Sequence, residues 1–407
     1  MKERAFGFWL VIVTLAWFVV GLVFIRGFAP VDFYGDGAYF AQSVMRWIEH
    51  GWPTTLLAGP QGAEFGWGFF TIWIYISLIR LTFQLFGQNP WAMRFLSLIS
   101  VGVALTLAGL IMARLRENKA GSAGMFFLLM ALSPLPLVIG HTERPEGLAA
   151  LWITASVALM LLPRKRFFQN LGFFILPMSF WIHQLGGLMA FCLFMAMILA
   201  LPVMRKHGQR ILWLMAGGII VLVTSLFVSC YSGKLLILGY VVGISEKGWG
   251  IVKILSSWHL MIAVTVAALA FLLWPLRKAR LDLDKTLLAL ITIGLVILPM
   301  IFGMRPRRIF QFVYPLLWIL LYIGFLYAAQ IGRLFKYGFL ALVLAGMCFY
   351  WWRSASVLRI TLLNPAYVRA AKWFMQKNQE RIASADSILW PSTARDTSSG
   401  FCQRKSN

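Results

Sequence analysis

Charge is scarce in this sequence, and its scarcity excludes most classes of soluble protein. Only 13% of the 407 residues are charged, whereas 60% are hydrophobic. A soluble domain carries about 25% charged residues and has correspondingly less apolar surface to hide. Several uncharged runs approach the roughly 20 residues that span a bilayer. The composition therefore predicts a polytopic membrane protein, and it excludes a soluble enzyme and a disordered chain.

Cysteines and familiar catalytic motifs are equally sparse. The chain has 4 cysteines, and neither a CxxC pair nor a cysteine–histidine cluster occurs. This argues against a disulfide scaffold and gives no support for a zinc site. P-loop, GxGxxG, GxSxG and HExxH sequences are absent as well. The apolar run after MKER is too long for a signal peptide and lacks a small-residue cleavage site, so we expect a retained first helix.

The uncharged runs predict an all-α fold with about 11 transmembrane helices. We expect 1–352 to form a transmembrane domain and 353–407 a short polar tail. The run 167–204 is long enough for two short spans, with a polar break at 181–184. The expected spans are 5–25, 95–113, 120–140, 147–163, the two within 167–204, 211–233, 254–276, 286–304, 309–332 and 337–352.

Segment 65–79 is aromatic and apolar but short for a span, and basic residues decide its placement. If it lies flat on the membrane, five basic clusters fall on the cytoplasmic side together with the N-terminus, as the positive-inside rule requires. If it spans, all five move outside. We therefore predict a first outward loop over 26–94 that contains interfacial helices. The clusters lie at 114–119, 164–166, 205–210, 277–285 and 333–336.

The net charge of +23 has the same explanation. In a soluble protein such an excess would suggest nucleic acid as a partner. Here it reflects mainly the cytoplasmic clusters, so we expect no nucleic-acid partner. The basic residues are expected to contact membrane lipids instead. The rare acids are more informative, because half of them fall in the outward loops.

Two acids open the first outward loop. Asp32 and Asp36 stand four residues apart, directly after the first span. A carboxylate there can take a proton from an acceptor hydroxyl, or bind a divalent cation, while an anionic leaving group departs. The alternative is a solvated acid that caps the helix expected over 38–50, since Asp is a favoured N-cap. Tyr39 follows and is a candidate for a donor or acceptor pocket.

A second polar cluster interrupts the apolar runs at 141–147, which reads HTERPEG. Charged groups at the end of a span usually face a protein interior or a water-filled cavity. Glu146 could serve as a second carboxylate, Arg144 could bind phosphate, and Glu143 could line a pocket. Alternatively, these charges are solvated in a turn, and Pro145 starts the next helix. His183 lies at the outward turn within 167–204, where a single histidine is more often structural than catalytic.

Three arginines, Arg305, Arg307 and Arg308, lie in a later outward loop, where the positive-inside rule predicts few. The guanidinium fork matches phosphate oxygens. A bound phosphate explains these residues better than topology does, and contact with lipid headgroups is the simpler alternative.

The order of these elements resembles the GT-C superfamily of integral-membrane glycosyltransferases. The resemblance rests on GDGAYFA at 35–41, NPWAMR at 89–94 and ERPEGL at 143–148, and it extends over roughly 5–330. The nearest relatives would be the bacterial dolichyl-phosphate-mannose-type transferases and the lipid A sugar transferases. The resemblance implies transfer of a sugar from a polyprenyl-phosphate donor to a lipid, glycan or protein acceptor, at the periplasmic face of the bacterial inner membrane.

The resemblance also assigns roles to residues. Asp36 matches the family's first-loop acid, the base or cation ligand. Gly37 stands where many members carry a second acid, so Asp32 or Glu146 would have to supply it, and the need for a divalent cation is left open. Arg144 and Glu146 match the Arg-Pro-acid element, and the arginines at 305–308 match the basic loop that holds the lipid phosphate. A single displacement implies inversion at the anomeric carbon.

Two rival functions belong to other classes. A transporter of lipid-linked sugars or polysaccharides usually shows internal repeats and charges within its spans, and the sequence shows neither. A non-catalytic envelope assembly protein would use its outward loops to bind partner proteins, which the sequence leaves open. Members of the resembled family often carry a further outer domain after the last span, so we expect either a minimal member or one that lacks that region.

Overall fold

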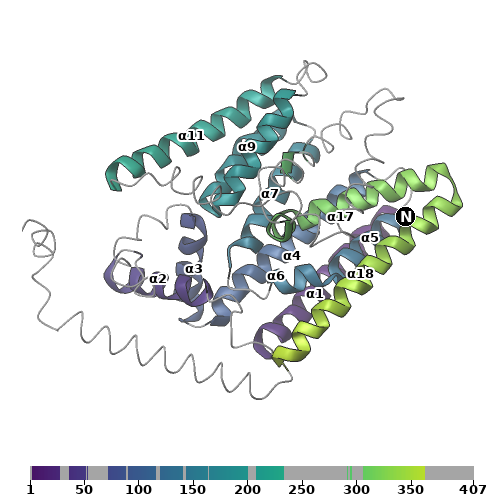
Figure 1. The fold of residues 1–407 in the computed structure, drawn as a ribbon, viewed down its shortest axis with the longest axis horizontal. Coiled ribbons are helices and arrows are strands. Elements are labelled where there is room, and N and C mark those ends of the chain that lie inside the picture. The colour runs from purple at the N-terminus through teal and green to yellow at the C-terminus, as the bar shows by residue number, and fades with distance from the viewer. Residues whose placement is uncertain are drawn as a thin grey trace, which may run out of the picture.

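The computed structural model is built from helices throughout the part of the chain that it describes, and no strand occurs there. Figure 1 shows long helices packed side by side into a bundle, with two shorter helices, α2 and α3, at one end of it. The structure describes residues 2–27, 36–51, 53, 72–88, 90–115, 120–140, 144–163, 165–199, 208–232, 291, 294–295 and 306–362.

Most of the expected spans in this part of the chain are observed as helices. Four of them, α4, α11, α17 and α18, are long and apolar enough to cross a membrane by length and composition. The predicted helix total stays a prediction, because 254–276 and nearly all of 286–304 lie outside the described residues. The long helices are α1 (Lys2–Gly27), α4 (Pro90–Leu115), α7 (Glu146–Leu161), α9 (Gln184–Leu199), α11 (Gly208–Ser232), α17 (Pro306–Ile331) and α18 (Arg333–Leu362).

The expected span 120–140 is divided into α5 (Ala120–Leu132) and α6 (Pro134–Gly140). The break falls at Ser133, whose backbone N–H and hydroxyl both donate to the Met130 carbonyl, at 3.2 and 2.8 Å. Proline at the first position of α6 needs no N–H donor there and starts the new helix. Two short helices therefore replace the single predicted one.

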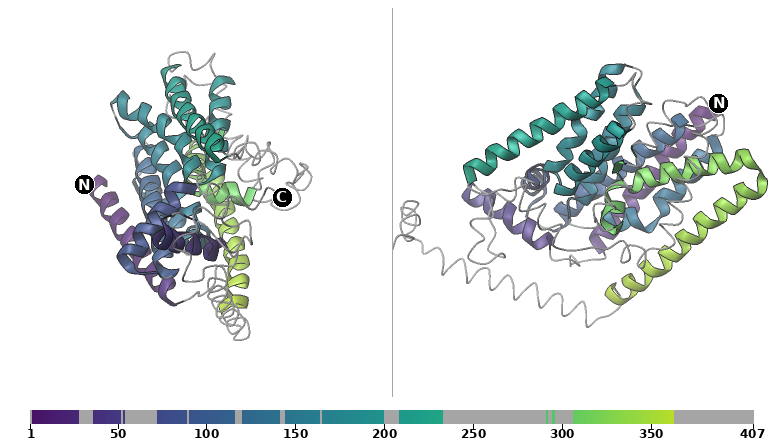
Figure 2. Two further views of the ribbon diagram at one scale, coloured as in Figure 1. Left: turned by 90° about the vertical axis from the view of Figure 1, so that its left-hand side faces the viewer. Right: turned by 45° about the horizontal axis from the view of Figure 1, so that its top comes forward.

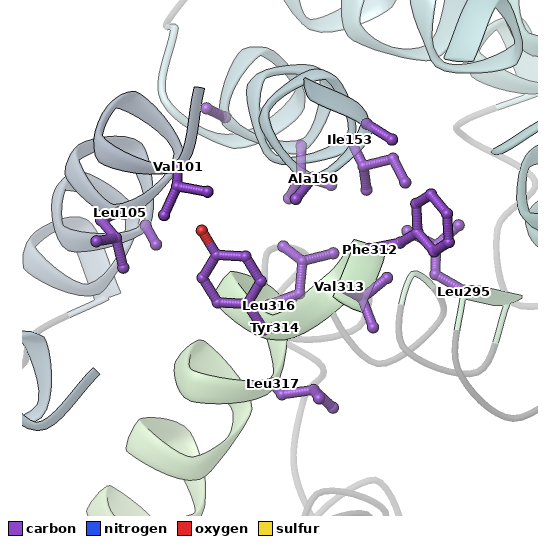
Figure 3. Close-up of a cluster of buried hydrophobic side chains, with 14 of the residues drawn as sticks. Val101, Leu105, Ala150, Ile153, Leu295, Phe312, Val313, Tyr314, Leu316 and Leu317 are labelled. Carbon is purple, nitrogen blue, oxygen red and sulfur yellow. The ribbon is translucent and has the colours of Figure 1, made fainter. Parts of the chain in front are cut away.

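Helices α4, α7 and α17 form the centre of the bundle and are in mutual contact. Tyr314 and Leu316 of α17 lie beside α4 and α7, and the Tyr314 hydroxyl is directed toward Val101 (Figure 3). Tyr314 is almost fully buried, and so is Ala150 on α7. The central helices are thus apolar on nearly all sides, as expected for helices enclosed by others.

Helices α11 and α18 run along opposite flanks of the bundle (Figure 2). Both present large apolar side chains outward, including Phe227 on α11 and Leu334 on α18. Continuous apolar faces of this kind are unusual on soluble proteins. Here they provide a hydrocarbon-compatible surface, which agrees with the membrane protein expected from the composition.

Two short helices fill the described part of the first loop. They are α2 (Asp36–His50), which is amphipathic, and α3 (Trp73–Phe86). The expected surface segment was 65–79, but the helix begins at Trp73 and continues through Arg80. Because the Arg80 guanidinium lies 4.7 Å from the centre of the Trp47 ring on α2, its charge is accommodated by a cation–π contact. The helix therefore continues past the charge to Phe86.

The predicted break at 181–184 is confirmed. Helix α8 (Arg166–Ile175) continues into the 3₁₀ helix η2 (Leu176–Trp181), and α9 starts at Gln184. α8, η2 and α9 pack against α11, and η2 also contacts α7 and α3. The turn between η2 and α9 is consequently at the same end of the bundle as α3.

Candidate active site

The first polar centre is an ion pair at the start of α7. Arg144 binds Glu146 through two contacts, Nη2 to Oε1 at 2.9 Å and Nε to Oε2 at 3.2 Å. The side chains are only 11% and 3% exposed, so the pair is shielded from bulk water. This paired arrangement fixes the plane of the guanidinium. The alternative of freely solvated turn charges therefore fails for these two residues.

The chain around this ion pair is held closely against α4. The Ser97 hydroxyl donates to the Arg144 carbonyl at 3.4 Å. Gly147 follows directly, and a Cβ there would lie 3.3 Å from the Ser97 carbonyl oxygen. Only glycine allows α7 to approach α4 so closely without a shift of either backbone. The pair thus stands on two packed helices, which is a rigid support for a binding group.

Pro145 occupies the N-cap position of α7, and Glu146 is the first helical residue. A carboxylate in the first turn of a helix is stabilised by the positive end of the helix dipole. Glu146 therefore has two favourable partners, the dipole and Arg144. Its predicted role as a second carboxylate stays a prediction. The geometry supports a different role for Glu146, which is to orient the Arg144 guanidinium.

The candidates of the first loop are described only in part. Asp36 is the first residue of α2, and Tyr39 belongs to its first turn, but only their backbones are described. Asp32 lies outside the described residues, and so does Glu143. The expected helix 38–50 is confirmed with a start at Asp36. Phe40, one turn further, contacts the Tyr75 ring of α3 edge-on, with centroids 5.4 Å apart.

His183 is buried in the turn between η2 and α9. Its Nδ1 accepts a hydrogen bond from the backbone N–H of Leu185 at 3.1 Å. Its ring meets the Phe312 ring of α17 edge-on, with centroids 4.8 Å apart. Both contacts support the expectation that a single histidine in this turn has a structural role. A role in a pocket stays a prediction.

The late arginines lie around the start of α17. The helix begins at Pro306, so Arg307 and Arg308 occupy its first turn, whereas Arg305 lies outside the described residues. Only the backbone is described at Arg307 and Arg308. Phe312 follows Arg308 by one helical turn and touches His183. The start of α17 is thereby placed next to the turn between η2 and α9.

Contacts between elements bring four separate parts of the sequence to one end of the bundle. Helix α2 packs on α3, and α3 packs on both α4 and η2. Ser97, near the start of α4, reaches the turn before α7, and His183 after η2 reaches α17. The start of α2 is thus connected to α4 through α3, the Arg144–Glu146 pair to α4 through Ser97, and the η2–α9 turn to α17 through His183. These four parts are those in which the sequence predicted site residues.

Two buried arginines belong to the same end and were not among the predicted site residues. Arg46 on α2 is 7% exposed, and Arg94 in the first turn of α4 is 4% exposed. Both are engaged in interactions within the protein. Arg94 stands at the junction of a polar stretch and a long apolar run, and buried charges require partners. A charged residue at such a junction is the sequence feature that could have identified Arg94 as a candidate.

A cation site is not apparent in the described part of the chain. Among those residues, no group of three or more His, Cys, Asp or Glu side chains is close enough to hold a metal ion. Glu146 is bound to a guanidinium instead of standing beside another acid. A divalent cation at Asp36 stays a prediction.

None of the protein-family models and none of the curated protein sequences matches this chain. Two crystal structures of ArnT from Cupriavidus metallidurans are similar in fold. The structure bound to undecaprenyl phosphate gives a TM-score of 0.53 at 14% sequence identity, over 78% of this chain and 59% of ArnT. The apo structure gives 0.54 at 15% identity, over 80% of this chain and 60% of ArnT.

The chain thus spans less than two thirds of ArnT's length. At this level of identity the likeness concerns the arrangement of helices. The described part of the chain is all-α, it contains helices long and apolar enough to cross a membrane, and its arrangement of helices is similar to that of ArnT.

Proposed function

We propose that this protein is a membrane glycosyltransferase. It moves a sugar from a polyprenyl-phosphate donor to an acceptor hydroxyl at the periplasmic face of the bacterial inner membrane. The observation that carries the proposal is the buried Arg144–Glu146 pair at the start of α7, which is held against α4. The fold likeness to ArnT, which was crystallised with undecaprenyl phosphate, supports a lipid phosphate as the donor's leaving group.

The proposed reaction is a single displacement. The Asp36 carboxylate accepts the proton of the acceptor hydroxyl, whose oxygen attacks the anomeric carbon. The bond from that carbon to the phosphate oxygen breaks, and the polyprenyl phosphate leaves with the electron pair. Attack opposite the leaving group inverts the anomeric configuration. General-base help of this kind is worth roughly 10²–10⁴-fold in rate.

The arginines supply the second requirement, which is the neutralisation of phosphate charge. Arg307 and Arg308 on α17, together with Arg305, are assigned to the leaving phosphate, where positioned cations stabilise developing charge. Arg144 is held in a fixed plane by Glu146, so it is preorganised for a planar, two-point contact. A divalent cation, if one binds at Asp36, would help to neutralise the same charge.

The experiment that tests the proposal compares Asp36→Asn with the wild type in membranes. The product is measured by mass spectrometry of envelope glycolipids, in cells with and without the protein. Asp36→Asn should abolish the sugar-modified product while the protein level stays normal. Glu49→Gln is the matched control, because Glu49 lies on the same helix with an exposed side chain.

Three outcomes would contradict the proposal or one of its steps. Unchanged transfer by Asp36→Asn would remove Asp36 from the mechanism. Movement of the lipid-linked sugar across the membrane without its attachment to any acceptor would assign the protein to the transporters instead. Retained anomeric configuration in the product would contradict the single displacement.

A further inference from the structure

His183 makes two contacts that serve different purposes. Its Nδ1 accepts the Leu185 N–H at 3.1 Å, which satisfies one of the unpaired donors in the first turn of α9. The rest of the ring meets Phe312 on α17, with centroids 4.8 Å apart and planes at 64°. Edge-on contacts of this kind are attractive beyond the area they bury. One side chain therefore ends a turn and also braces a second helix.

The turn that carries His183 is tightly built. The N–H groups of Ile182 and His183 both donate to the Ser179 carbonyl, at 3.1 and 2.9 Å. The Gly186 N–H donates back to the His183 carbonyl at 2.8 Å. A Cβ on Gly186 would lie 2.6 Å from the Ser179 hydroxyl oxygen, so the turn has closed to a distance that only glycine permits. The position of the imidazole is consequently fixed by the backbone.

The start of α17 depends on such lateral support. Pro315 lies inside α17, and its ring removes the N–H that would bond to the Gln311 carbonyl. The ladder of helix hydrogen bonds is weakened between the first turns of α17 and the remainder. Phe312 lies in these first turns and is fully buried. Its contact with His183 therefore stabilises the first turns of α17, which are less firmly attached to the rest of the helix because one backbone hydrogen bond is missing at Pro315.

We propose that His183 is a positioning residue for the lipid phosphate of the donor. Through Phe312 it fixes the first turns of α17, and with them the backbone of Arg307 and Arg308, which are assigned above to that phosphate. This inference rests on the proposed function. It adds a residue that touches neither sugar nor phosphate and acts only through α17.

The test measures binding of undecaprenyl phosphate to the purified full-length protein in detergent, together with the melting temperature. His183→Asn keeps an oxygen acceptor for the Leu185 N–H but loses the ring. Phe312→Leu removes the same contact from the other side and leaves the turn intact. Both should raise the Kd by roughly two- to tenfold, the fold-change to which an aromatic pair corresponds. Phe191→Leu, at an exposed phenylalanine on α9, should leave the Kd unchanged.

A third variant separates positioning from capping. His183→Phe retains a ring against Phe312 but has no acceptor for the Leu185 N–H. It should melt at a lower temperature than the wild type and bind the lipid with a Kd within about twofold of it. If His183→Phe loses affinity as strongly as His183→Asn, the ring contact is not the cause and the inference is wrong.

The remaining outcomes are distinct for the two proposals. If the wild type does not bind undecaprenyl phosphate, the proposed function is overturned, and this inference with it. If the wild type binds and both His183→Asn and Phe312→Leu bind equally well, the inference alone is overturned. Should His183→Asn be too unstable to purify, Phe312→Leu decides the matter by the same criterion.

Discussion

Arg144 and Glu146 form a two-point ion pair, with Nη2 to Oε1 at 2.9 Å and Nε to Oε2 at 3.2 Å, at the first turn of α7. The pair is shielded from water and lies where α7 packs against α4. Its geometry separates two roles that the sequence could not distinguish. Glu146 orients Arg144, and Arg144 can then present its guanidinium to an anion.

Replacing Glu146 by Gln should destabilise the protein strongly. The substitution leaves the buried Arg144 charge without its carboxylate, and breaking a buried pair in this way costs about 3–5 kcal/mol. The expected observation is a clearly lower melting temperature of the purified protein in detergent. Arg166→Gln, at an exposed arginine at the start of α8, also removes one charge and should leave the melting temperature within the experimental scatter.

The double variant Arg144→Met with Glu146→Met should recover most of the stability lost by Glu146→Gln. Two apolar side chains of similar length need no charge partner, and such replacements are often neutral or stabilising. Sugar transfer should still be lost, because the oriented guanidinium is missing. A double variant that is stable and fully active would show that the pair serves folding alone.

The order of helices could be derived from the sequence because apolar length is a direct requirement of the bilayer. The runs at 5–25, 95–113, 147–163, 211–233 and 309–332 all coincide with observed helices. The break near His183 was also predicted, since three polar or amphipathic residues, Trp181, His183 and Gln184, interrupt an otherwise apolar run. In these places a local property of the sequence determines the structure.

Features that depend on contacts between distant segments could not be derived in this way. The apolar segment 65–79 stops before Arg80, and the Trp47 ring accommodates that charge from another helix, so α3 continues to Phe86. The division at Ser133 was missed for a different reason, because it depends on a serine followed by proline, a local pattern that counting apolar residues overlooks. The Arg144–Glu146 pair was visible as two residues, whereas its burial depends on the approach of α4 to Gly147.

Removing the arginines of α17 should weaken binding of the lipid phosphate. Arg307→Gln and Arg308→Gln each delete one positive charge near the start of the helix. Each should raise the Kd for undecaprenyl phosphate by about ten- to a hundredfold, since a hydrogen bond to a charged group is worth roughly 1.5–3 kcal/mol. Lysine at either position should restore affinity only in part, because it cannot offer the planar fork.

The control for these variants is Arg166→Gln. Arg166 is exposed at the start of α8, at the end of that helix away from η2 and His183. It should leave the Kd unchanged at a given ionic strength. Equal losses of affinity in all three glutamine variants would mean that the lipid is held by general charge attraction and not at α17.

Gly147 should tolerate alanine poorly. A Cβ there would lie 3.3 Å from the Ser97 carbonyl oxygen and 3.4 Å from a Val101 methyl group, so α4 and α7 must move apart by a few tenths of an ångström. Valine demands more room and should cost about 1–3 kcal/mol, as overpacking usually does. Gly218→Ala on α11 is the matched control, because no atom lies within 4 Å of its Cβ position. That change should stabilise the helix by up to about 1 kcal/mol, so melting curves should shift in opposite directions.

The stacked side chains of the first loop should determine how firmly α2 and α3 are held. The Arg80 guanidinium lies over the Trp47 ring, and Trp47 in turn stacks on Trp73 with centroids 4.7 Å apart. Arg80→Gln removes the cation and should loosen this contact by about 1 kcal/mol. Hydrogen exchange of the α2 and α3 amides should therefore become faster by about fivefold. Arg333→Gln, at an exposed arginine on α18, should leave that exchange unchanged. Exchange that is equally slow in Arg80→Gln would mean that α2 is held by α3 and α4 through apolar packing alone, and that the arginine is dispensable for placing Asp36.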